Sequence, residues 1–87
     1  MDKVDLDDLN RRLAFLCTRL WFTPTVRRIS PNDPRLLFQA VTWRDGKRFE
    51  HTALFSISEV ARLGPVAAAN AFVENARAAL PRGSVQP

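Results

Sequence analysis

Two long strand-like runs separated by the dipeptide Asp45-Gly46 constrain the fold of this chain more than any other sequence feature. The runs cover residues 35–44 and 47–55. Asp-Gly is favoured at the centre of a type I′ turn, because both central residues must adopt a positive φ, which aspartate and glycine tolerate. The sequence therefore predicts a β-hairpin with a two-residue turn.

A two-residue turn also fixes which residues of the hairpin lie opposite each other. Counting outwards from the turn places Arg44 opposite Lys47 and Phe38 opposite Ala53. One face of the hairpin is then mostly apolar and consists of Leu36, Phe38, Ala40, Phe49, Ala53 and Phe55. The other face mixes polar residues with Leu37, Val41, Trp43 and Leu54. This alternation is typical of an antiparallel sheet that is covered on one face only.

A leucine stripe precedes the hairpin and predicts an amphipathic helix. Apolar residues recur at spacings of three and four, at Leu6, Leu9, Leu13, Leu16 and Leu20. Ion pairs at i,i+4 are expected between Asp7 and Arg11 and between Asp8 and Arg12. Thr23-Pro24 ends the helix, because a residue before proline is disfavoured in the α conformation.

A shorter strand is expected between this helix and the hairpin. Residues 25–30 are rich in β-branched side chains, and residues 31–34 supply the proline, asparagine and aspartate of a reversing turn. The register of this strand stays open at this point, because Val26 and Ile29 would lie on opposite faces of a regular strand.

A broken helix is predicted after the hairpin. Ser56 and Glu59 have the spacing of a capping box, with Ser56 as the N-cap and Glu59 reaching back to it. Gly64-Pro65 interrupts the helix, since proline suits the first position of a new one. Residues 65–80 then carry an apolar stripe of Val66, Ala69, Val73, Ala76 and Leu80.

The expected fold class is therefore α+β, with two layers. A three-stranded antiparallel meander is covered on one face by an N-terminal helix and a broken C-terminal helix, in the order αβββα. Residues 1–80 are expected to form a single domain, and residues 81–87 a flexible C-terminal tail.

The inventory of reactive side chains argues against catalysis. The chain of 87 residues has one histidine, one cysteine and no tyrosine, and it lacks the known phosphate-binding and nucleophile motifs. Cys17 and His51 are the one conceivable catalytic pair, and we interpret them as core residues. We expect a protein that is not an enzyme and that binds no cofactor and no metal ion.

The same inventory suggests a location. Cys17 cannot form an internal disulfide, and the first residues are acidic, whereas a secretory signal begins with basic residues. No apolar run approaches the roughly 20 residues of a membrane span. We therefore expect a cytoplasmic protein with no membrane partner.

Positive charge is concentrated in the middle of the chain. The net charge is +4, and the segment 21–50 holds six basic and three acidic residues. Arginine and tryptophan are enriched where proteins bind macromolecules. We also expect a cation–π pair between Trp43 and Arg48 across the hairpin. The candidate partner-binding or nucleic-acid-binding residues are Arg27, Arg28, Arg35, Trp43, Arg44, Lys47 and Arg48.

These features favour a small non-catalytic interaction protein, an adaptor or inhibitor that docks on a larger protein or ribonucleoprotein assembly. Its size and style match anti-CRISPR and other anti-defence inhibitors of phages and mobile elements, without any shared sequence motif. The alternative is a basic nucleic-acid-binding module that uses the arginine-rich hairpin. The apolar residues on the second face of the sheet also fit a homodimer.

Overall fold

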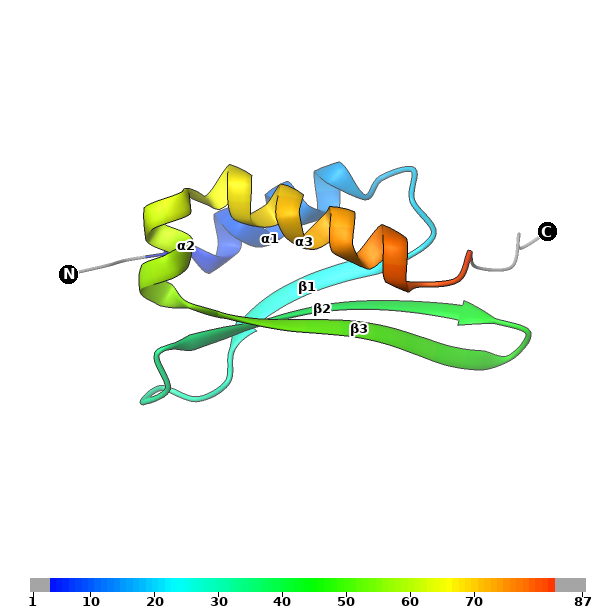
Figure 1. Cartoon of the computed structure of the whole chain (residues 1–87), viewed down its shortest axis with the longest axis horizontal. Helices are drawn as coiled ribbons and strands as arrows, with labels where there is room; N and C mark the ends of the chain where they lie inside the picture. Colours follow the sequence, from blue (N-terminus) through cyan, green and yellow to red (C-terminus); the bar gives the residue numbers. More distant parts are fainter. Residues whose placement is uncertain (1–3, 83–87) are drawn as a thin grey trace.

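The helices and strands of the protein follow the predicted order. A computed structural model describes residues 4–82. Along this part of the chain lie α1 (Leu6–Leu16), β1 (Thr23–Arg28), β2 (Arg35–Arg44), β3 (Lys47–Ser56), α2 (Ile57–Leu63) and α3 (Pro65–Ala79). The αβββα arrangement and the α+β fold class are confirmed (Figure 1).

The three strands form one antiparallel sheet in the order β1-β2-β3. The hairpin turn is confirmed, because Asp45 has a φ of 53° and Gly46 a φ of 78°. The hairpin register is confirmed as well, with Arg44 opposite Lys47 and Phe38 opposite Ala53. A two-residue turn of this type matches the right-handed twist of the strands, which explains why so short a signal determined the pairing.

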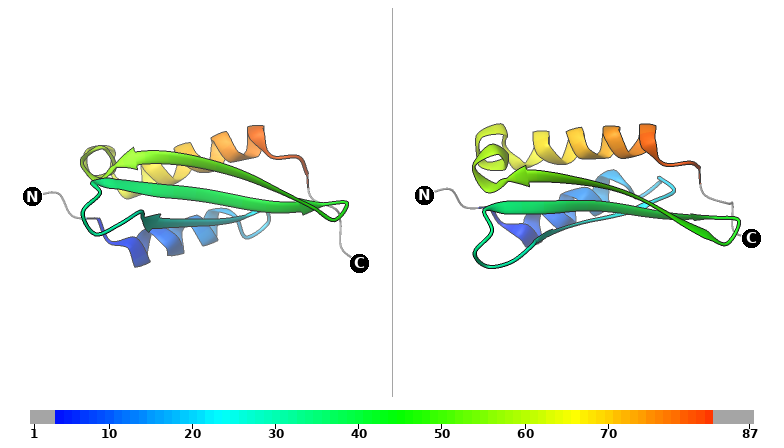
Figure 2. Two further views of the ribbon diagram at one scale, coloured as in Figure 1. Left: turned by 90° about the horizontal axis from the view of Figure 1, so that it is seen from below. Right: turned by 60° about the horizontal axis from the view of Figure 1, so that its bottom comes forward.

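All three helices lie on one face of the sheet, and the opposite face is uncovered (Figures 1 and 2). Leu36, Phe38 and Ala40 of β2 are fully buried beneath the helices. The ring of Phe72 in α3 lies 5.3 Å from that of Phe38. The left view of Figure 2 looks onto the uncovered face, where β2 runs between β1 and β3.

The hairpin extends beyond the helical layer at its turn (Figures 1 and 2). Strands β2 and β3 have 10 residues each and α3 has 15. At about 3.4 Å per strand residue and 1.5 Å per helical residue, the strands are roughly 34 Å long and α3 roughly 22 Å. Phe49 lies on the helical side of the sheet as predicted, opposite the buried Thr42, but the helices do not extend far enough to cover it, and 36% of its surface is exposed.

Asn10 of α1 fixes the first strand. Its Nδ2 donates to the carbonyl oxygen of Val26 at 3.0 Å, and its Oδ1 accepts from the Val26 amide at 2.9 Å. Val26 lies opposite Phe38 and is buried. This contact settles the register that the sequence left open, and Ile29 falls beyond the end of β1.

Helix α1 ends earlier than its leucine stripe predicted. The helix stops at Leu16, with Cys17 as its C-cap, so that Leu20 lies outside it. The hydroxyl group of Thr18 donates to the carbonyl oxygens of Ala14 and Phe15, at 3.1 and 3.0 Å. These side-chain bonds replace backbone bonds that would continue the helix.

The start of α1 confirms one predicted ion pair and not the other. Arg12 Nε lies 3.0 Å from Asp8 Oδ2, as expected at i,i+4. Arg11 pairs with Asp8 as well, at 3.7 Å, so the predicted partnership between Asp7 and Arg11 is wrong. Asp5 acts as the N-cap, since its side chain accepts a bond from the Asp8 amide.

The broken C-terminal helix is confirmed. Ser56 caps α2 by accepting from the Glu59 amide at 3.0 Å, and Gly64 separates α2 from α3 with a φ of 92°. Val66 does not reach the core and is 50% exposed. Beyond the predicted domain boundary at residue 80, the guanidinium group of Arg82 lies 4.7 Å from the centre of the Trp21 ring. The remainder of the predicted tail, residues 83–87, lies outside the described residues.

No helix in the described part of the chain is long and apolar enough to cross a membrane.

Candidate interaction surface

The uncovered face of the sheet, called the open face below, gathers four of the predicted binding residues. Side chains on a strand alternate between the two faces. Because Val26 and Phe38 point towards the helices, their neighbours in the sequence point the other way. The open face therefore carries Thr25, Arg27, Arg35, Leu37, Gln39, Val41, Trp43, Arg48, Glu50, Thr52 and Leu54.

An apolar strip, interrupted by the pair Gln39 and Thr52, runs along the middle of the open face. Trp43 is 59% exposed and Leu54 49% exposed, while Leu37 and Val41 are half-buried between their neighbours. Leu37 lies opposite Arg27 on one side and opposite Leu54 on the other. Apolar side chains surrounded by arginines are typical of protein-binding surfaces, where the apolar part is desolvated and the rim stays polar.

The structure separates the predicted binding residues into two groups. Those on the open face are Arg27, Arg35, Trp43 and Arg48. Those that alternate to the helical side of the sheet are Arg28, Arg44 and Lys47, and all three are exposed there. Arg35 and Arg44 begin and end the ten-residue strand β2 and are therefore roughly 30 Å apart. The predicted residues do not form one continuous basic patch.

Arg35 is held by an acidic neighbour. Its Nε donates to Asp33 Oδ1 at 3.0 Å and its Nη2 to Asp33 Oδ2 at 2.9 Å. This two-point contact lowers the pKa of Asp33. The hydrogen bond from Arg35 is the largest cause, and the backbone amide of Arg35 adds a further bond. The pair presents a fixed and partly neutralised arginine at the end of the open face.

Arg48 is also paired with a carboxylate. Its Nη1 lies 3.0 Å from Glu50 Oε2, which accepts a second bond from Gln39 at 2.6 Å. The hydrogen bond from Gln39 is the largest cause of the lowered pKa of Glu50, followed by the charge of Arg48. The predicted cation–π pair between Trp43 and Arg48 is wrong, because the carboxylate holds the guanidinium group and leaves the indole ring exposed.

The other predicted bases have weaker partners or none. Arg44 Nε lies 3.9 Å from Asp45 Oδ2, and Arg28 Nη2 donates to the Pro31 carbonyl oxygen at 3.4 Å. For Arg27 and Lys47, no side-chain hydrogen bond or ion pair is found within residues 4–82. Arg27 is thus the arginine of the open face whose guanidinium group is available to a partner.

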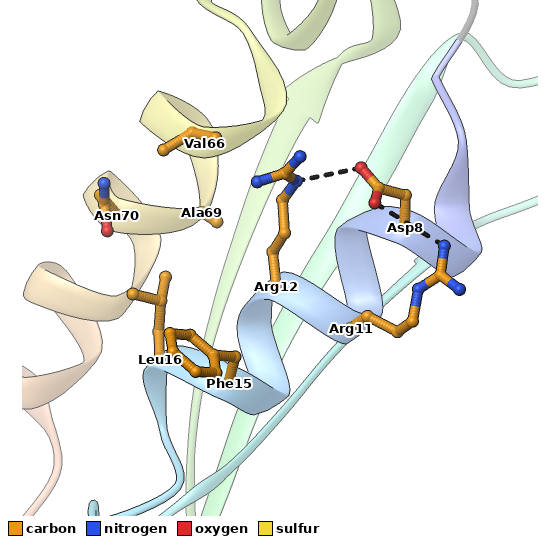
Figure 3. A pocket seen from close by; sticks show the side chains of 8 residues that line it. All are labelled: Asp8, Arg11, Arg12, Phe15, Leu16, Val66, Ala69 and Asn70. Carbon is orange, nitrogen blue, oxygen red and sulfur yellow. Dashed lines mark hydrogen bonds and ion pairs between the residues drawn. The ribbon is translucent and has the colours of Figure 1, made fainter.

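Sequence reasoning missed a second surface feature, a groove between α1 and α3 on the opposite side of the molecule (Figure 3). Its volume is about 470 Å³. Phe15 is 79% exposed at one wall, and the Arg12 and Arg11 side chains turn towards Asp8 along the rim. The signal was present in the sequence, since Phe15 lies just outside the leucine stripe of α1. The groove is lined by Asp8, Arg11, Arg12, Phe15, Leu16, Val66, Ala69 and Asn70.

Cys17 and His51 occupy separate structural roles. Cys17 is buried at the end of α1, and this burial raises the pKa of its thiol. The His51 ring stacks on Phe72, with ring centres 5.8 Å apart. No hydrogen bond joins the two side chains in the part of the chain that the structure describes.

Comparison with models of protein families, with curated proteins and with solved structures finds no match for this chain.

Proposed function

We propose that this protein is a non-catalytic interaction domain, an adaptor or inhibitor whose open face docks onto a larger protein or ribonucleoprotein assembly. One observation carries the proposal. The strip of Leu37, Val41, Trp43 and Leu54 crosses the centre of a sheet face on which no helix lies. Exposed apolar patches of this kind on small proteins mark surfaces that bind other molecules.

The charges around the strip indicate what kind of partner fits. Arg35 and Arg48 each have a carboxylate within 3.0 Å, which reduces the positive field of the open face. Arg27 has no such neighbour within residues 4–82 and lies beside Leu37. A protein surface that offers apolar side chains and one acidic residue complements this arrangement.

Nucleic acid is the second candidate, and Trp43 is the observation that favours it. An exposed indole beside arginines can stack with an unpaired base. The two basic ends of β2 are separated by roughly 30 Å and by the apolar strip, which fits a phosphate backbone less well. This alternative predicts an affinity that falls steeply as the salt concentration rises.

The test is a capture experiment from native lysate with a nuclease-treated arm and three forms of the protein. The wild type and Phe15→Ser should retain the same discrete proteins after digestion, because Phe15 lies on the opposite side of the molecule. The double variant Trp43→Ser/Leu54→Ser should lose them. Loss of the bound material on digestion, or equal retention by the double variant, would refute docking of a protein on the open face.

The anti-CRISPR-like role and the cytoplasmic location remain predictions from the sequence. An adaptor and an inhibitor would use the same surface, so the open face does not distinguish between them. The anti-CRISPR-like role rests only on the small size of the chain and its lack of a catalytic motif. The cytoplasmic location stays a prediction from the single cysteine, which cannot form an internal disulfide. Identification of the captured proteins addresses both.

A further inference from the structure

The two edges of the sheet differ in how their backbone groups are satisfied. On β1, the outward-facing positions include Pro24, which has no amide hydrogen, and Val26, whose amide and carbonyl both bond to Asn10. Proline and side-chain caps are the devices by which proteins prevent an edge strand from pairing with another chain. The β1 edge is therefore closed around Val26.

Among the described residues 4–82, nothing protects the β3 edge near the turn in a comparable way. Lys47 flanks a two-residue turn and so bonds to β2, and alternate residues from there on do the same. The residues between them direct their amide and carbonyl groups outwards; near the turn these are Arg48, Glu50 and Thr52. Within residues 4–82, no hydrogen bond to these outward groups is found. This edge can accept another strand.

The charges on this edge select a partner. Arg48 and Glu50 occupy consecutive outward positions and carry opposite charges. Charged side chains usually discourage edge pairing. An antiparallel copy of the same strand centred on Phe49 is an exception, because it places Arg48 opposite Glu50 of the second copy and Glu50 opposite Arg48 of the second copy. A centre on Arg48 or on Glu50 would place like charges opposite each other.

Phe49 supports the same centre. It bonds inwards to β2, so towards the outer edge it occupies a non-hydrogen-bonded position, where side chains of paired strands lie closest. Its ring is 36% exposed, because the hairpin extends beyond α3 at this point (Figures 1 and 2). In the pairing described, the two Phe49 rings would cover each other.

We propose that the protein forms a symmetric dimer by antiparallel pairing of β3 with β3 of a second copy, centred on Phe49. This inference does not depend on the proposed docking function. The pairing joins the two open faces into one surface, with Trp43 and Arg48 of one copy next to Glu50 and Val41 of the other. The contact is short, and interfaces below about 1,000 Å² are weak, so the dimer is concentration-dependent.

Sedimentation equilibrium of the purified protein without any partner tests this proposal. The wild type should rise from 9.9 kDa towards twice that mass as its concentration increases. Glu50→Arg and Arg48→Glu each place like charges opposite each other. The dimer dissociation constant of each variant alone should therefore rise by about tenfold or more. A mixture of the two variants restores both opposite-charge pairs and should form a heterodimer. Circular dichroism of each variant verifies that it is folded.

The mixture of the two variants distinguishes specific pairing from non-specific association. A wild type that stays monomeric up to millimolar concentration would overturn the proposal. So would single variants that associate like the wild type, or a mixture that associates no better than its components. None of these results depends on whether the open face captures a partner from lysate.

Discussion

Two hydrogen bonds join the side chain of Asn10 in α1 to the backbone of Val26 in β1. The Asn10 side chain donates to the Val26 carbonyl oxygen at 3.0 Å and accepts from the Val26 amide at 2.9 Å. An asparagine amide has the same donor and acceptor pattern as a peptide group, so Asn10 substitutes for one residue of a neighbouring strand. The contact both anchors α1 and closes the β1 edge.

Asn10→Ala is expected to lower the free energy of unfolding by about 2 kcal/mol, because two part-buried backbone groups of Val26 lose their partner. Urea denaturation followed by circular dichroism measures the change. Asn75→Ala is the matched control, since Asn75 is exposed on α3 and no hydrogen bond to its side chain is found in the described residues. Equal stability of the two variants would show that the Asn10 contact contributes nothing.

Two leucines report on the two faces of the sheet. Leu36 is fully buried under the helices, and Leu54 on the open face is 49% exposed. Leu36→Ala should lower the free energy of unfolding by about 3 kcal/mol, through lost burial and a residual cavity. Leu54→Ala should change it by less than about 1 kcal/mol. If Leu54→Ala were as destabilising as Leu36→Ala, the open face would not be free of helices in solution.

The pair of Asp33 and Arg35 gives a pH-dependent signature. Asp33 has a lowered pKa, so its contribution to stability is present above the unfolded-state pKa and is lost as the pH falls through the folded-state pKa. Carbon-13 NMR should show the Asp33 carboxyl group titrating at a lower pH than an isolated aspartate. Arg35→Gln should move that titration back upwards. An unchanged Asp33 titration in the variant would mean that the pair is absent in solution.

Cys17 should be unreactive in the folded protein at neutral pH. Its burial raises the pKa of the thiol, and the thiolate is the form that reacts with alkylating reagents. Labelling should therefore be slow under native conditions and should accelerate many-fold in denaturant. Rapid labelling of the native protein would instead support the catalytic reading of Cys17 and His51.

Local chemistry determined what could be predicted from the sequence. The Asp45-Gly46 turn fixed the hairpin register by itself, and the Gly64-Pro65 break and the Ser56 cap needed only neighbouring residues. Features that depend on distant residues escaped prediction. The Asn10 contact spans 16 positions in the sequence, and the exposure of Phe49 depends on the length of α3 relative to that of β3.

For the candidate site as well, local sequence information was sufficient for part of the prediction, and the rest depended on distant residues. The composition of the basic segment identified the binding residues as a set, but the alternation of side chains divided them between the two sides of the sheet. Carboxylate partners also make two of these arginines less available to a binding partner. Asp33 and Glu50 hold Arg35 and Arg48, and this leaves Arg27 and Trp43 as the more available groups of the open face.

Site-specific photo-crosslinking in native lysate tests the docking role of the open face most directly. A photoreactive residue at Thr25 would report on the open face, away from the β3 edge, and one at Ala78 would report on the exposed side of α3. The account predicts a discrete protein adduct from position 25 that resists nuclease, and none from position 78. An adduct from position 78 alone, or a nuclease-sensitive adduct from position 25, would contradict it.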